Sequence, residues 1–163
     1  MSYGRWAVVW ALPACLAACA AGSEGGERAP RVVFKVRMDK GLKPGPTKSP
    51  DGKFGVAVKG HNAQLVLARS GKPVGPVLGH HDTGRVAKRR LTWAFSPDGK
   101  LLATAFSADT RGGGDSAGDV RVWEVPGGKL VARPRQPLGY VHALRFSADG
   151  KTLEIDCEEI SGK

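Results

Sequence analysis

The chain has 163 residues, a length that favours a single ordinary core. Its formal net charge of +10 favours anionic partners such as phospholipid surfaces or acidic proteins. The basic residues are scattered and few aromatics lie among them, which argues against a nucleic-acid partner. The three cysteines indicate no internal disulfide and show no zinc-type spacing with histidine, so neither a metal nor another cofactor is expected.

Residues 1–20 have the layout of a secretory signal peptide, and residues 21–30 follow as a polar linker. Arg5 supplies the positive start, and an uncharged, mostly apolar run comes after it. The run is shorter than the roughly 20 residues that span a bilayer. We therefore expect an exported protein rather than one anchored by a helix.

The end of this run reads Leu16-Ala17-Ala18-Cys19, which resembles the lipobox of bacterial lipoproteins. The resemblance implies that Cys19 is lipidated and becomes the mature N-terminus. Ordinary cleavage after Ala20 also satisfies the small-residue rule. The expected location is the cell envelope or periplasm, with contact to a membrane only through a lipid anchor.

Beyond the linker, short apolar-alternating segments separated by turn residues predict β-strands. Residues 31–37 alternate well, whereas residues 41–48 are rich in Gly, Pro and Lys and predict a loop. A tight-turn phrase then occurs three times, as Ser49-Pro50-Asp51-Gly52-Lys53, Ser96-Pro97-Asp98-Gly99-Lys100 and Ser147-Ala148-Asp149-Gly150-Lys151. Its Asp-Gly pair suits a short hairpin, and its recurrence predicts a repeat of small antiparallel sheets.

The phrase divides residues 31–163 into units of about 31–78, 79–138 and 139–163. The middle unit has the pattern of four strands, at residues 91–95, 101–106, 119–125 and 129–132. The first unit matches it with strands at 54–59 and 63–69 and one after Gly71, and the last unit carries only the strands 141–146 and 151–157. Comparison of the units indicates an insertion in the middle one, at Thr110–Gly118.

These motifs resemble the WD-repeat family of β-propellers. The middle unit carries Gly79-His80, then Trp93–Lys100, and ends its third strand in Trp123-Glu124, where the family has Trp-Asp. The resemblance implies an all-β fold of four-stranded antiparallel sheets, or blades. About two and a half blades are expected, which is fewer than the roughly four to eight that close a ring.

The family resemblance also implies a buried hydrogen-bonded chain within a blade, made of a His, a Ser or Thr, an Asp and the Trp. His80, Thr104 and Trp123 match three of these members. Ala117 occupies the position expected for the Asp, unless Asp115 or Asp109 reaches in from the insertion. We expect such an incomplete network to contribute less than a complete one.

Three outcomes are open for an incomplete propeller. The chain associates with copies of itself or with another propeller protein, or it forms an open stack whose edge is paired by the strand at 31–37, or it is a truncated product that folds poorly. The surface candidate for a partner is a basic loop with Arg85, Lys88, Arg89 and Arg90. We expect the inserted loop at Thr110–Gly118 to emerge on the same face.

No catalytic constellation is evident in the sequence. His80-His81-Asp82 lacks a second ligand cluster, and no Gly-x-Ser-x-Gly elbow is present. The predicted function is therefore that of a non-enzymatic interaction surface. The alternatives are an assembled propeller that binds a ligand or catalyses a reaction in its central channel, and an intracellular scaffold.

Overall fold

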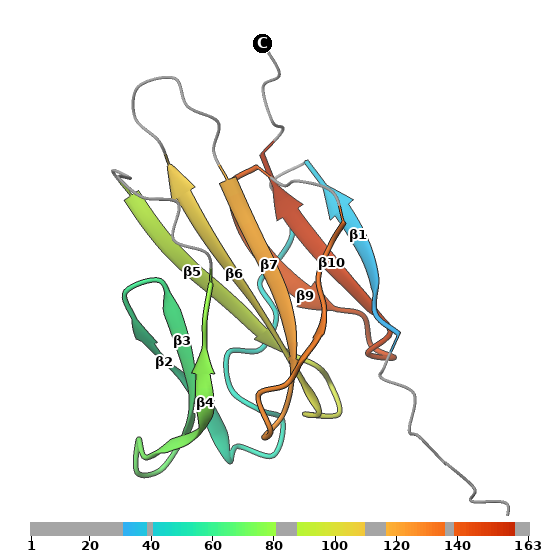
Figure 1. Ribbon diagram of the computed structural model, residues 1–163. Coiled ribbons are helices and arrows are strands. Elements are labelled where there is room, and N and C mark those ends of the chain that lie inside the picture. The colour runs from blue at the N-terminus through green and yellow to red at the C-terminus, as the bar shows by residue number, and fades with distance from the viewer. Residues whose placement is uncertain (1–30, 39–40, 81–87, 110–116, 136–138, 159–163) are drawn as a thin grey trace, which may run out of the picture.

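The computed structural model describes residues 31–38, 41–80, 88–109, 117–135 and 139–158. All regular elements in these ranges are β-strands, which confirms the predicted all-β class (Figure 1). They form three sheets. The first sheet contains β2 (Phe54–Lys59), β3 (Asn62–Leu67) and β4 (Pro73–Leu78); the middle sheet contains β5 (Lys88–Phe95), β6 (Leu101–Asp109), β7 (Ala117–Glu124) and β8 (Leu130–Ala132); the last sheet contains β9 (Val141–Phe146), β10 (Thr152–Cys157) and β1 (Val33–Arg37).

The repeated phrase forms the same turn three times. In the middle copy the Ser96 hydroxyl donates to Asp98 Oδ1 at 2.6 Å and accepts from the Leu101 amide at 2.9 Å. The Lys100 amide donates to the same carboxylate at 3.1 Å, and Gly99 has a φ of 73°. The turns that begin at Ser49 and Ser147 repeat these bonds, with glycine φ of 69° in both. Only glycine adopts this conformation without strain.

The middle sheet lies between the other two, so both of its faces are covered (Figure 1). Alternate residues of β6 explain this arrangement. Ala103 and Ala105 belong to the core shared with the last sheet, whereas Leu102 belongs to the core shared with the first. Residues Leu101–Ser107 of β6 are all buried, as expected for a central strand packed on two sides.

Strand β1 lies in the last sheet and not with the first unit. It pairs in parallel with β10, from Val33 opposite Thr152 to Arg37 opposite Asp156. Phe34 and Val36 thereby pack against the core between the middle and last sheets. The N-terminal strand therefore covers the edge of the last unit, as expected for an open stack.

The first sheet has three strands because the segment at residues 41–48 takes a different course from its counterpart β5. It runs between the middle and last sheets, where the Gly45 amide donates to the Leu144 carbonyl at 2.8 Å and the Phe95 amide donates to the Pro46 carbonyl at 3.0 Å. Gly45 approaches so closely that a Cβ would lie 2.9 Å from Ala94 Cβ. Among the described residues, the three sheets form no closed ring or barrel.

Candidate functional site

The structure brings His80, Thr104 and Trp123 together in the interior. The Trp123 indole N–H donates to Thr104 Oγ1 at 2.7 Å, and Thr104 Oγ1 lies 2.8 Å from His80 Nε2. Thr104 is fully buried, and the side chain of His80 is likewise inaccessible. These residues come from β6, β7 and the segment after β4, so the hydrogen bonds join the first sheet to the middle sheet.

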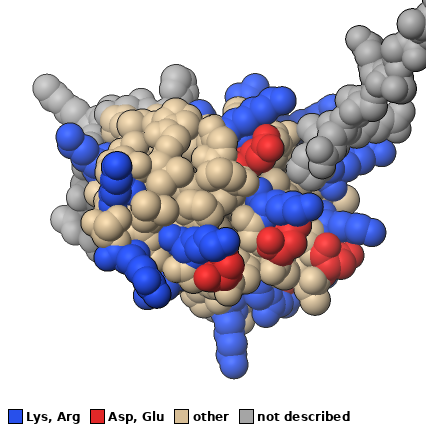
Figure 2. All heavy atoms as spheres, turned by 90° about the horizontal axis from the view of Figure 1, so that it is seen from below, with Lys and Arg blue, Asp and Glu red and all other residues tan. Residues whose placement is uncertain are grey.

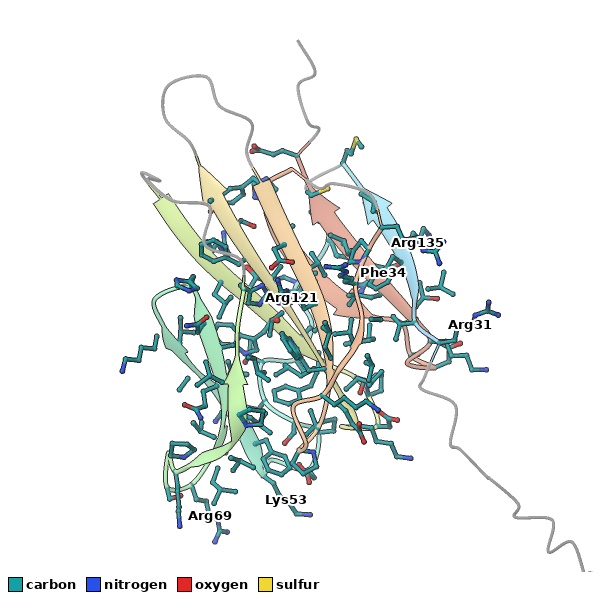
Figure 3. The ribbon with its side chains drawn as sticks, in the orientation of Figure 1. Arg31, Phe34, Lys53, Arg69, Arg121 and Arg135 are labelled. Atoms are coloured by element: carbon teal, nitrogen blue, oxygen red, sulfur yellow. The ribbon has the colours of Figure 1, made fainter. Side chains whose placement is uncertain are left out.

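The fourth member of this network is Asp119, which the sequence analysis missed. Its Oδ2 lies 3.2 Å from His80 Nδ1. Asp119 also accepts from Arg121 Nε at 2.9 Å, and Arg121 Nη1 donates to the Gly79 carbonyl at 2.9 Å (Figure 3). The sequence analysis expected an incomplete network, because Ala117 occupies the position at which the family has its Asp, but Asp119 supplies the carboxylate instead. Asp119, Arg121 and Trp123 alternate along β7, so the period of a strand places all three on one face.

The direction of the hydrogen bonds follows from the groups that take part. A carboxylate only accepts, so His80 Nδ1 carries the ring proton toward Asp119. His80 Nε2 then accepts from the Thr104 hydroxyl, whose oxygen accepts in turn from Trp123. Each buried polar group of this four-residue network has a partner, which is the condition under which a polar network stabilises a core. The arrangement joins strands and leaves no buried donor free for a substrate.

The basic cluster is only partly a loop. Strand β5 begins at Lys88, so Lys88, Arg89 and Arg90 pair with Asp109, Ala108 and Ser107 of β6. The predicted strand began at residue 91; it starts earlier because β6 extends to Asp109 and offers backbone partners that far. Arg90 is exposed. Arg85, the side chains of Lys88 and Arg89, and most of the inserted segment, residues 110–116, lie outside the described residues, as does Cys19.

The start of β5, the end of β6 and the start of β7 lie at the same end of the middle sheet. Lys88 pairs with Asp109, and Ala117 pairs with Ala108, so the chain enters β5 and leaves β6 side by side. The opposite end carries the repeated turn. The prediction that the basic loop and the inserted loop share a face concerns residues 81–87 and 110–116, which lie outside the described residues.

Strand β2 has an unpaired edge. It pairs with β3 along all six residues, and no other described strand pairs with it. In the middle sheet the corresponding edge of β6 is covered by β5. Ala57, Val58 and Lys59 are exposed at this edge.

The first sheet also borders a shallow hollow of about 400 Å³, lined mainly by the β2–β3 hairpin from Lys59 to Gln64 together with Val77. Its lining is largely apolar and presents no cluster of acid and base groups. Within the described ranges, no group of three or more His, Cys, Asp or Glu side chains is placed to hold a metal ion. No helix in this part of the chain is long and apolar enough to cross a membrane.

Cys157 is the one cysteine within the described residues, and it is buried at the end of β10. Burial raises the pKa of its thiol above the usual value. The protonated thiol is a poor nucleophile and a poor metal ligand. This residue therefore acts as a small core side chain.

No family model matches the sequence, and no curated protein matches it at a significant level of similarity. The relation to WD-repeat propellers therefore remains a prediction from the residues that carry it.

Proposed function

We propose that the chain is a non-enzymatic, exported, WD-repeat-like protein that binds other proteins by accepting a strand at the open edge of β2. A second copy of the chain is the first partner that we propose. The observation that carries the proposal is the unpaired edge itself. Sheets packed face to face, the repeated turns and the four-member network support the WD-repeat interpretation.

The edge of β2 is open for a reason that lies in the sequence. The segment that precedes the first turn contains Pro44, Pro46, Gly41 and Gly45, where the middle unit has strand formers. Proline has no amide hydrogen to donate to a sheet, and glycine weakens a strand. The chain therefore supplies no first strand of its own here. Phe54 bonds to Ser49 at the start of the edge, and no described strand pairs with the rest of β2.

The two edges of the first sheet differ in how well they are protected. Strand β4 contains Pro73 and Pro76, which remove amide donors from its edge. Strand β2 contains no proline, and its only charged residue is the terminal Lys59. Val58 on β2 remains 48% exposed. An unprotected edge with an exposed valine is the kind of surface to which another strand adds.

The face of the first sheet that points away from the middle sheet is also suited to contact. The cross-strand row Ala57–Gln64–Val77 is uncharged, and Val77 is 55% exposed. The corresponding face of the last sheet is charged, because Arg145 and Glu154 form an ion pair of 2.6 Å there. Two copies that meet through their β2 edges can satisfy a twofold axis, the commonest symmetry of oligomers.

The proposal is tested by the mass of the full chain in solution, measured by light scattering over a range of concentrations. Val58→Lys places a like charge on both sides of a β2–β2 pair, which destabilises cross-strand pairing. We expect it to weaken self-association at least tenfold. Leu130→Lys, a matched control at an exposed apolar residue on β8 of the middle sheet, should weaken it much less. A monomer at all concentrations, or equal effects of the two variants, would contradict strand addition at β2.

Export and anchoring need a separate measurement. Labelling in a bacterial host with a palmitate analogue should mark the full chain and not the Cys19→Ala variant. Absence of label together with fractionation into the cytosol would point to an intracellular scaffold.

A further inference from the structure

We propose that the face formed by the turns at one end of the sheets docks on an anionic phospholipid bilayer. Five turns meet there, at residues 49–53, 68–72, 96–100, 125–129 and 147–151. The backbone bonds between turns of one sheet fix this arrangement: the Ala68 amide donates to the Lys53 carbonyl, and the Val125 amide to the Lys100 carbonyl, each at 2.8 Å.

Cations dominate this face. Seven exposed basic side chains lie in or next to the turns: Lys48, Lys53, Arg69, Lys72, Lys100, Lys129 and Lys151. Four acidic residues, Asp51, Asp98, Glu124 and Asp149, lie in or next to the same turns, so the formal charge of the face is 7 − 4 = +3. Figure 2 shows the molecule from this side, with Lys and Arg side chains projecting across the face and around its rim.

All four acidic residues are exposed, but Asp51, Asp98 and Asp149 accept hydrogen bonds within their own turns. The carboxylate of Asp98 accepts from Ser96 and from the Lys100 amide, and Asp149 is bound in the same way. Within the described residues, Lys53 is the one cation of the seven in an ion pair, at 3.3 Å from Asp51. The other six ammonium and guanidinium groups are available to an external anion.

The chain enters the described fold at this same face. The Val33 amide donates to the Lys151 carbonyl at 2.9 Å, which places Arg31 beside the last of the five turns (Figure 3). The predicted lipid site, Cys19, precedes Arg31 by twelve residues. A chain of that length spans at most about 40 Å. A bilayer that holds a lipid on Cys19 is thus within reach of this face.

The composition of the face favours lipid headgroups over nucleic acid. The five turns contain no aromatic residue on which a base could stack. Their cations are distributed over three sheets. A broad face with scattered lysines suits a surface of many mobile phosphates, whose attraction falls with salt. The proposal does not depend on strand addition at β2, so either can fail alone.

The test uses the full chain carrying Cys19→Ala, so that no lipid is attached, and vesicles of phosphatidylcholine with or without 30% phosphatidylglycerol, taken as a roughly typical anionic content. We expect binding to the anionic vesicles that weakens with salt and is much weaker on neutral ones. Each lysine at an anionic surface strengthens binding roughly fivefold. The variant K53Q/K100Q/K151Q should therefore bind at least about tenfold more weakly.

The matched control is K35Q/K43Q/R135Q, which removes three exposed basic side chains away from the turns and lowers the net charge equally. It should bind within about a factor of two of the parent chain. Equal losses in the two triple variants, or equal binding to neutral and anionic vesicles, would overturn the proposal. Tighter binding to a short DNA duplex than to the vesicles at the same salt would reassign the face to nucleic acid.

Discussion

Replacing Thr104 by Val is expected to be strongly destabilising because of the hydrogen bonds that this residue makes. The hydroxyl accepts from Trp123 at 2.7 Å and donates to His80 at 2.8 Å, in a site with no solvent access. Valine has nearly the same shape but leaves both partners buried and unpaired. Each such group costs roughly 1–3 kcal/mol, so we expect a loss of about 3 kcal/mol.

The matched control is Thr92→Val on β5. Thr92 is also buried, but its hydroxyl has no hydrogen-bond partner among the described residues. The same substitution there removes an unsatisfied group, so the free energy of unfolding should stay unchanged or rise slightly. The pair therefore separates the network from the general effect of replacing a buried hydroxyl by a methyl group.

The measurement is urea denaturation of the full chain followed by circular dichroism. Domains are typically stable by only about 5–15 kcal/mol, so a loss of about 3 kcal/mol would shift the midpoint clearly. The difference between the two variants is the quantity of interest. If Thr104→Val and Thr92→Val lose equal stability, the hydrogen bonds of the network do not stabilise the fold, and our reasoning about it is refuted.

Three further predictions concern the turns, a close contact and the thiol. Burial opposes ionisation of Asp98, but hydrogen bonds from the turn outweigh it and lower the pKa of this carboxyl below 3.8. The free energy of unfolding should therefore fall as the pH drops below about 4, and it should fall less in Asp98→Asn. An equal loss of stability with pH in the two proteins would contradict this. Gly45→Ala should lower the free energy of unfolding by about 1–3 kcal/mol, measured by urea denaturation, because the new Cβ has no room. Gly127→Ala should lower it much less, since a Cβ there has nothing within 4 Å. Equal losses would disprove the close contact. In a chain whose other two cysteines are replaced by Ala, Cys157 should react with a thiol reagent only on unfolding, because its thiol is buried and protonated. Rapid reaction of the folded chain would contradict this.

Local patterns in the sequence predicted the strands and turns because the physics behind them is local. The Ser-x-Asp-Gly-Lys phrase closes its own hydrogen bonds within six residues, so it forms the same turn in three different places. Alternation of apolar residues likewise placed strands close to where they lie, with ends that differ by a few residues. The start of β5 at Lys88 was missed because charged residues in an exposed strand end give no alternation signal.

The members of the buried network were predictable in part. His80, Thr104 and Trp123 follow from the family resemblance, whereas Asp119 does not, because the motif puts its Asp at the position of Ala117, two residues earlier. The period of two along β7 carried the missing information, since Asp119 shares a face with Trp123. In this blade, the alternation of side chains along β7 therefore identifies the carboxylate of the network better than the position of the Asp in the family motif does.

The sequence by itself determined that the chain is all-β and built from a repeated turn, because those properties depend on neighbours within a few residues. Only the tertiary structure decided which strands meet across long separations. It placed β1 beside β10 and moved residues 41–48 away from β2 to lie between the middle and last sheets. Such pairings depend on which strand edges still lack a hydrogen-bonding partner, and on which apolar surfaces are still exposed, once all the sheets have packed. The open edge of β2, from which the proposed function is argued, is a product of that competition.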